Sequence, residues 1–153
     1  MRISVASDSL DGVASILVSA IEKRGHTVTP HGALVGETAG GTAGERADWA
    51  WCCARAARDV ASGAADQAVV CCWTGTGASI AANKVPGIRA ALCADAVTAD
   101  GARRWNDANV LAISLRSTSA PLLGEILDAW FAGIPSPDEE DRANIAYLSE
   151  MEN

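Results

Sequence analysis

A cysteine followed by a glycine-rich turn is the feature of this sequence best suited to chemistry. Cys72 ends a buried apolar run, and Gly75 and Gly77 permit the tight or left-handed turns that precede a helix. Backbone N–H groups in such a turn point into one concavity, with the positive end of the helix dipole behind them. The segment 72–77 therefore predicts a site for a phosphate or an oxyanion, although a purely structural turn has the same pattern.

Cys72 adds a reactive group to this turn. A thiol at a strand end, just before a helix N-terminus, lies where the thiolate form is favoured, and a thiolate serves as a base or a nucleophile. The neighbouring Cys71 should point to the opposite side of the strand and belong to the core. The alternative is that Cys72 is one more small buried residue. The turn has neither the GxGxxG fingerprint nor a Walker A lysine, so a nucleotide-binding module has no motif behind it.

The elements that position this turn alternate along the chain. Apolar runs with β-branched residues predict strands at 2–7, 27–29, 67–72, 87–93 and 109–114. Helical spacing predicts helices at 13–24, 48–62, 78–84, 96–104 and 121–131, with a polar helix or tail at 138–151 in the C-terminal region 135–153. The glycine-rich segment 32–44 is expected to be a mobile loop. Strict alternation predicts a single domain over 1–153, with a three-layer α-β-α, Rossmann-like α/β fold and a mostly parallel sheet.

Candidate ligand-binding positions follow from this architecture. In a parallel α/β sheet the ligand crevice lies outside the carboxyl ends of the strands. Asp8 follows the first predicted strand, Cys72 ends the third, and the segment 105–109 is expected near such an end as well. These positions should therefore line one crevice.

Composition argues against several classes of partner. The 153 residues have a net charge of −7 and no basic stripe, so we expect no nucleic acid partner. Apolar stretches are too short for a membrane helix, and we expect no membrane association. The five cysteines form no CxxC pair, which predicts reduced thiols in a cytoplasmic protein and no metal site.

The segment after the turn resembles a known family signature. The residues of this signature are Cys72, Thr74, Gly75, Gly77 and the runs 79–84 and 87–90, and the similarity extends to Asp8 and to the segment 106–112. On these residues the chain resembles type B ribose-5-phosphate isomerases and galactose-6-phosphate isomerase subunits.

The resemblance implies aldose–ketose isomerisation of a phosphorylated sugar, without metal or cofactor. It implies that Cys72 moves a proton through an enediolate, while Thr74 and the backbone of 75–77 stabilise the developing oxyanion. It also implies a homodimer, or a dimer of dimers, with each site shared between two subunits. The substrate-binding residues on this basis are Asp8, Ser9, Trp73, Gly75, Thr76, Gly77, Trp105, Asn106, Arg116 and Arg142.

Four residues depart from the family pattern. Trp105 stands where a histidine commonly opens the sugar ring, Ser9 replaces another histidine, Trp73 replaces a glycine, and Asp138 replaces the first of two phosphate-binding arginines. An indole N–H only donates, so it cannot shuttle a proton to and from a ring oxygen. Three interpretations stay open: a short or open-chain sugar phosphate, an acid supplied by an unlike partner chain, or a catalytically silent protein that binds a ligand in this crevice.

Overall fold

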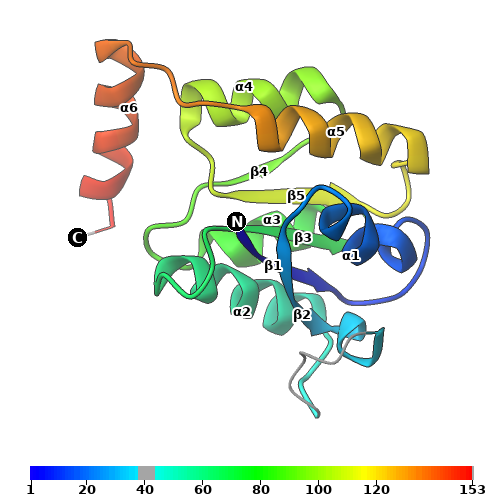
Figure 1. Cartoon of the computed structure of the whole chain (residues 1–153). Helices are drawn as coiled ribbons and strands as arrows, with labels where there is room; N and C mark the ends of the chain where they lie inside the picture. Colours follow the sequence, from blue (N-terminus) through cyan, green and yellow to red (C-terminus); the bar gives the residue numbers. More distant parts are fainter. Residues whose placement is uncertain (38–43, 153) are drawn as a thin grey trace.

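A five-stranded parallel sheet forms the centre of the part of the protein that the structure describes, a computed structural model of residues 1–37 and 44–152 (Figure 1). The strands are β1 (Arg2–Ser7), β2 (Thr27–Gly32), β3 (Gln67–Cys72), β4 (Ala90–Leu92) and β5 (Val110–Ser114). They lie in the order β2-β1-β3-β5-β4, and each neighbouring pair is parallel. The predicted parallel sheet is therefore confirmed.

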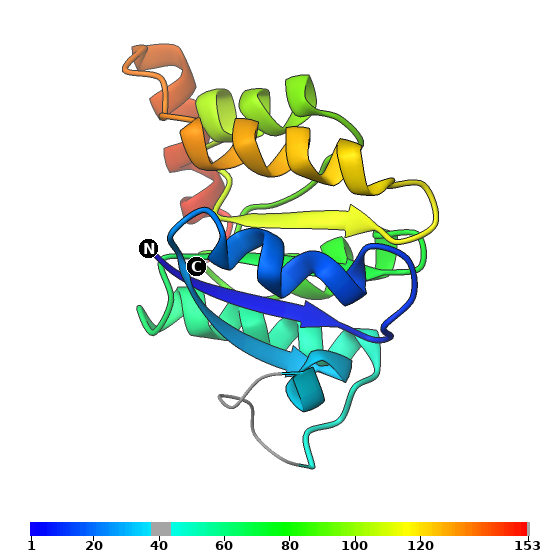
Figure 2. The same ribbon diagram turned by 45° about the vertical axis from the view of Figure 1, so that its right-hand side comes forward.

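Helices cover both faces of the sheet, as Figures 1 and 2 show. The helices on one face are α1 (Ala14–Glu22), α4 (Ala96–Asn106) and α5 (Ala120–Ala132), and those on the other are α2 (Trp49–Ala61) and α3 (Thr76–Asn83). The last helix, α6 (Glu139–Glu150), stands off the body and buries no residue. The predicted three-layer α-β-α fold is confirmed. Across the described ranges, no helix combines the length and the apolar character needed to cross a membrane.

The central strand β3 carries Cys72 and is buried along its whole length. Val69 and Cys71 pack in the core shared with α1, α4 and α5, whereas Val70 and Cys72 pack in the core shared with α2 and α3. This alternation is the pleat of a β-strand. It confirms that Cys71 points away from Cys72 and into a core.

The second strand is longer than the sequence suggests. β2 continues to Gly32 because its residues stay in register with β1, where Gly32 lies opposite Ser7. Within the glycine-rich segment 32–44, a short 3-10 helix, η1 (Ala33–Glu37), follows directly. The remaining part of the predicted mobile loop, 38–43, lies outside the described residues.

The fourth strand is shorter than predicted, and side-chain amides hold the backbone where it begins. Asn109 Oδ1 accepts the N–H of Arg89 at 2.8 Å. Asn83 accepts the N–H of Ala90 at 2.8 Å and donates to its carbonyl at 2.9 Å. Asn83 and Asn109 therefore hold the turn between α3 and β4.

The carboxyl ends of β1 and β3 meet where the winding of the sheet reverses. The two strands are neighbours, with Ser7 opposite Cys71. The helix after β1 packs on one face and the helix after β3 on the other. Such a reversal opens a crevice, which is the usual ligand position in this architecture. Asp8 and Cys72 lie at this crevice, as predicted.

The segment 105–109 lies at the opposite edge of the sheet, so its predicted position is wrong. α4 ends at Asn106 and β5 begins at Val110, which places the connecting turn at the amino end of its strand. The apolar run of β5 was correctly predicted, but a turn that precedes a parallel strand cannot lie at that strand's carboxyl end. In Figures 1 and 2 the strand arrows point away from the edge beyond which α6 lies.

Candidate active site

Gly75 shapes the turn between β3 and α3. Its φ is 75°, and a Cβ at this position would lie 2.9 Å from the carbonyl carbon of Ile113, so both the backbone conformation and the close approach favour glycine. The Gly75 N–H donates to the carbonyl of Cys72 at 3.2 Å. Thr76 and Gly77 begin α3, and their N–H groups have no carbonyl partner within the helix. The turn therefore offers two free backbone donors.

Cys72 lies directly in front of this helix end. The N–H of Ala78 donates to Cys72 Sγ at 3.4 Å. The Cys72 side chain borders a pocket of about 320 Å³, whose other lining residues are Asp8, Trp49, Trp73, Thr74, Thr76 and Gly77. An N–H donor and a helix N-terminus both stabilise negative charge on sulfur. The sulfur therefore faces the pocket with a backbone donor and a helix N-terminus beside it.

Two threonine hydroxyls form the side of the pocket next to the cysteine. Thr74 Oγ1 and Thr76 Oγ1 lie 2.8 Å apart. One hydroxyl donates to the other, which leaves the second proton available for a ligand oxygen. With the free amides of the turn, this pair forms a donor-rich cradle of the kind that stabilises an oxyanion.

Asp8 brings a carboxylate into the same pocket. Its Oδ1 is buried and lacks a hydrogen-bond partner within residues 1–37 and 44–152. Burial raises the pKa of the Asp8 carboxyl, and the charges of Asp11 and Asp48 raise it further. A buried acceptor without a partner is costly, and a ligand hydroxyl would satisfy it.

Asp8→Asn should stabilise the free protein at neutral pH. Because the pKa of Asp8 is higher in the folded chain than in the unfolded chain, ionisation of Asp8 opposes folding above the folded-state pKa. We expect a melting temperature a few degrees above that of the wild type at neutral pH. The difference should shrink as the pH falls and should vanish below the ordinary Asp pKa, where Asp8 binds the proton in both states. Thermal unfolding as a function of pH measures this, and an unchanged or lower melting temperature at neutral pH would contradict it.

Ser9 and Arg116 lie near this edge but do not line the pocket. Ser9 Oγ accepts the N–H of Asp11 at 3.3 Å, so the hydroxyl supports its own loop. The backbone N–H of Arg116 donates to the carbonyl of Trp73 at 2.9 Å, which joins the loops after β3 and β5. The Arg116 side chain is exposed.

Two tryptophans form the apolar part of the pocket. Trp73 was predicted as a site residue, whereas Trp49 was not. The Trp49 ring lies against the glycine turn, since a Cβ on Gly77 would be 3.0 Å from it. The aspartate-aromatic segment 48–51 is the sequence signal that could have found Trp49. Asp48 stands at the N-cap position of α2, but its carboxylate pairs with Arg46 and makes no capping hydrogen bond.

A buried histidine holds the segment that leads to Trp49. His31 Nε2 lies 2.7 Å from Asp59 Oδ2 on α2, and His31 Nδ1 lies 3.1 Å from Glu45 Oε2. Ser4 Oγ donates to the same oxygen of Asp59 at 2.7 Å. These contacts connect β1, β2 and the start of the segment 44–48 and so fix the approach to α2.

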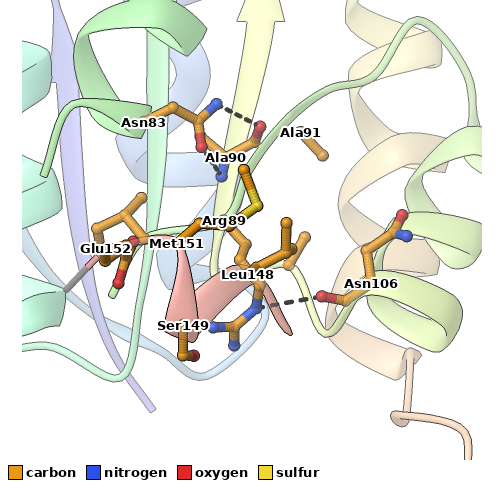
Figure 3. Close-up of a pocket in the computed structure, with 11 residues that line it drawn as sticks. Asn83, Arg89, Ala90, Ala91, Asn106, Leu148, Ser149, Met151 and Glu152 are labelled. Carbon is orange, nitrogen blue, oxygen red and sulfur yellow. Dashed lines mark hydrogen bonds between the residues drawn. The ribbon is translucent and has the colours of Figure 1, made fainter. Parts of the chain in front are cut away.

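The structure does not bring Trp105, Asn106 or Arg142 to the pocket of the same chain. Trp105 borders a shallow pocket with the linker 134–138, and Arg142 lies on α6. Asn106 lines a cavity of about 400 Å³ beside the last turn of α6, which Figure 3 shows. The reason is that Trp105, Asn106 and Arg142 lie at the amino edge of the sheet, whereas the pocket lies at its carboxyl edge. Within one chain, the predicted site therefore divides into two groups of residues at opposite edges.

The pocket lies at the switch point of a doubly wound sheet and contains a cysteine, hydroxyl donors and free helix amides. In an α/β protein, these groups suit a small oxygen-rich ligand. The model of one family, ribose/galactose isomerase, matches residues 3–146. The chain belongs to the ribose/galactose isomerase family, which confirms the resemblance in the sequence.

Individual relatives differ in the sugar that their names give. The chain is 43% identical over 96 residues to the galactose-6-phosphate isomerase subunit LacB of Clostridium acetobutylicum, which is 63% of this chain and 56% of the relative. It is 42% identical over 83 residues to the D-erythrulose-4-phosphate isomerase of Pectobacterium atrosepticum, 54% of this chain and 53% of the relative. The matches thus span about half the length of these relatives. The structure of ribose-5-phosphate isomerase B from Clostridium thermocellum is similar with a TM-score of 0.83 and 34% identity, over 99% of this chain and 97% of that one.

Proposed function

We propose that this protein interconverts an aldose and a ketose phosphate by proton transfer on Cys72. The thiolate takes the proton from the carbon next to the substrate carbonyl, and the electrons of that C–H bond move to the carbonyl oxygen as an enediolate forms. The thiol then returns the proton to the former carbonyl carbon, while the proton of the adjacent hydroxyl passes to the former carbonyl oxygen. The adjacent carbon thereby becomes the new carbonyl. The observation that supports this best is the single pocket in which Cys72, the threonine pair and the free amides of α3 meet Asp8.

Each polar group at the pocket has a role in the proposed reaction. The N–H groups of Thr76 and Gly77, with the free hydroxyl of the threonine pair, stabilise the charge on the enediolate oxygen. Asp8 accepts a hydrogen bond from a hydroxyl of the sugar at its unpartnered Oδ1. Arg116 at the rim pairs with the phosphate. No residue of the pocket has to change its ionisation other than the cysteine that carries the proton.

We propose that the substrate is a sugar phosphate. The candidates are ribose 5-phosphate and a short or open-chain sugar phosphate. Trp105 has no basic nitrogen, so the proposed site lacks the imidazole that would open a ring. Trp49 and Trp73 narrow the pocket beside Cys72. The similarity to a D-erythrulose-4-phosphate isomerase supports a four-carbon substrate, which cannot form the ring of a pentose phosphate.

We propose further that two copies of the chain share each site. In one chain, Asn106 and Arg142 lie at the opposite edge of the sheet from Cys72. A two-fold dimer can bring the amino edge of one copy to the carboxyl edge of the other, because each surface then recurs on the partner. Tyr147 on α6, Ile134 before it and Met151 directly after it are exposed apolar residues, and a second copy would cover them. Five free cysteines agree with a reducing compartment such as the cytoplasm.

Selective alkylation tests the role of Cys72 without knowledge of the substrate. Burial raises the pKa of Cys71, and raises that of Cys93 to about 12, so these thiols should react slowly. Cys72 opens into the pocket, and iodoacetamide should modify it about tenfold faster than either of them near neutral pH. Ribose 5-phosphate or erythrulose 4-phosphate should slow that reaction. Peptide mass spectrometry would contradict the proposal if Cys72 reacted no faster than Cys71, or if both sugars gave no protection.

A further inference from the structure

The turn after α4 has an unusual backbone conformation at Asp107. Its φ is 41°, and no other non-glycine residue of the described ranges has a positive φ. Asp107 ends α4, and its N–H donates to the carbonyl of Ala102. Aspartate tolerates this left-handed conformation better than most residues, but at some cost relative to glycine. Something other than turn geometry therefore accounts for a carboxylate here.

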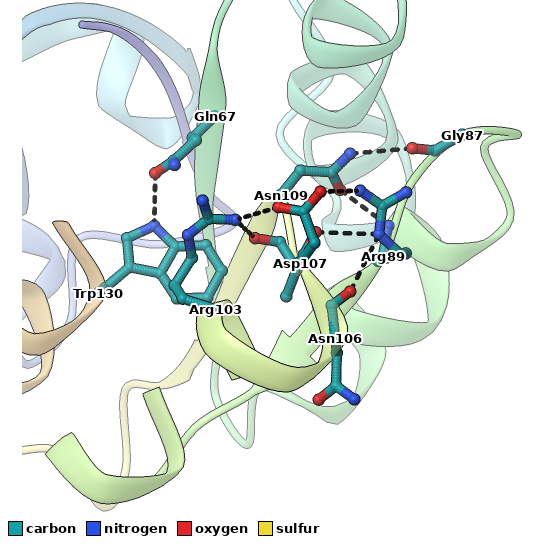
Figure 4. A network of polar contacts seen from close by, with 9 residues as sticks. Gln67, Gly87, Arg89, Arg103, Asn106, Asp107, Asn109 and Trp130 are labelled. Atoms are coloured by element: carbon teal, nitrogen blue, oxygen red, sulfur yellow. Dashed lines mark hydrogen bonds and ion pairs between the residues drawn. The ribbon is translucent and has the colours of Figure 1, made fainter. Parts of the chain in front are cut away.

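The Asp107 carboxylate joins two arginines, as Figure 4 shows. Oδ1 accepts from Arg103 Nη1 at 2.9 Å, and Oδ2 lies 3.2 Å from Arg89 Nη2. Arg89 Nε donates at the same time to the carbonyl of Asp107 at 2.9 Å and to that of Asn106 at 3.1 Å. We call Asp107, Arg89 and Arg103 the clamp, because together they fix both the side chain and the backbone of this turn.

The clamp is anchored in the core beside the central strand. The side chain of Arg103 is only 10% exposed, and its Nη1 also donates to the carbonyl of Ala108. Its guanidinium lies over the ring of Trp130 at 5.7 Å from the centroid. Trp130 Nε1 donates to Gln67 Oε1 at 2.8 Å, and Gln67 is the first residue of β3. The turn is thus connected to the strand that ends at Cys72.

The clamp holds two residues whose own side chains are exposed. Trp105 lies flat on α4, because a Cβ at Gly101 would be 2.6 Å from its ring, yet 54% of the residue is exposed. The side-chain amide of Asn106 makes no hydrogen bond to any described residue and borders the cavity of Figure 3. The buried clamp therefore adjoins two exposed groups, the indole of Trp105 and the side-chain amide of Asn106.

We propose that Asp107 is a positioning residue that fixes the direction of Trp105 and Asn106 for the ligand. This inference rests on the proposed function, in which these two residues complete the site of a partner copy. Displacing a substrate-contacting group by about 1 Å can cost on the order of 100-fold in rate. Loss of the carboxylate would free Arg89 and Arg103 and allow the turn to move by such an amount. In this proposal Asp107 acts through Trp105 and Asn106 and not by direct contact with the substrate.

The test compares Asp107→Gly, which keeps the left-handed turn without the ion pairs, with Asp107→Asn, which also keeps one acceptor. The matched control is Asp66→Asn, because Asp66 also accepts two bonds, from the backbone and side chain of Arg2, at a distant surface. Each protein is labelled with 5-fluorotryptophan, and loss of a fluorine resonance in Trp105→Phe assigns that residue. Fluorine NMR and sugar phosphate isomerisation are then measured well below the unfolding temperature.

We expect the Trp105 resonance to shift in Asp107→Gly, to shift less in Asp107→Asn and to stay unchanged in Asp66→Asn. The kcat of Asp107→Gly should fall at least about tenfold, with partial recovery in Asp107→Asn. An unchanged Trp105 resonance in Asp107→Gly would overturn the inference, and so would a shifted resonance with the wild-type kcat. If the wild type itself isomerised no sugar phosphate, the proposed function would fail instead, and the fluorine spectra would still decide whether Asp107 fixes Trp105.

Discussion

Cys72→Ala should lower the rate of sugar phosphate isomerisation by about 10²–10⁴-fold, the usual contribution of a positioned acid–base group. Among the described residues that line this pocket, Cys72 carries the only sulfur, and alanine removes it. The amides of Thr76 and Gly77 and the carboxylate of Asp8 would remain, so the variant should still bind the substrate. The expected loss therefore falls on kcat with a small change in KM.

Cys71→Ala is the matched control for this prediction. It makes the same chemical change one residue earlier, in a side chain that is fully buried on the other side of β3. We expect lower stability, because the substitution leaves a small cavity in the core, and nearly wild-type kcat at temperatures where the protein is folded. Equal loss of kcat in both variants would mean that Cys72 acts through packing alone.

Mixing two inactive variants should restore activity if copies of the chain share each site. In a hybrid dimer of Cys72→Ala and Asn106→Ala, one site combines both substitutions and the other is intact. Random exchange at equal concentrations makes half of the dimers hybrids, so about a quarter of the wild-type activity should return. The measurement is the isomerisation rate of the mixture after subunit exchange, compared with the rate of each variant alone.

The control mixture combines Cys72→Ala with Thr74→Ala. Both residues line the same pocket of one chain, so each site of that hybrid keeps one substitution and no activity should return. Recovery in the control mixture would contradict the assignment of Thr74. No recovery with Asn106→Ala, in dimers shown by light scattering to be mixed, would contradict the shared site.

The predictable part of the fold and site depends on local pattern. The buried run of β3, the glycine turn and the helix after it follow each other in sequence, so the position of Cys72 and the direction of Cys71 could be derived from the pleat. Asp8 could be derived as well, because it directly follows its strand. These residues need no knowledge of which elements meet in space.

The other site residues depend on contacts between distant segments. Trp49 reaches the pocket because α2 packs beside α3, and its ring lies against Gly77, which spacing along the chain does not reveal. The segment 105–109 was assigned to the wrong edge, since polar residues beside a strand look alike before and after it. The left-handed backbone of Asp107 and its two arginines belong to the same class of long-range features.

Proton NMR in D₂O is the measurement that tests the central claim most directly. The purified wild type is incubated with ribose 5-phosphate and, separately, with erythrulose 4-phosphate, beside Cys72→Ala. We expect the wild type to incorporate deuterium at the carbon next to the carbonyl of at least one of the sugars, and Cys72→Ala to incorporate none on the same time scale. Exchange that persists in Cys72→Ala, or no exchange by the wild type with either sugar, would contradict proton transfer by Cys72 on these substrates.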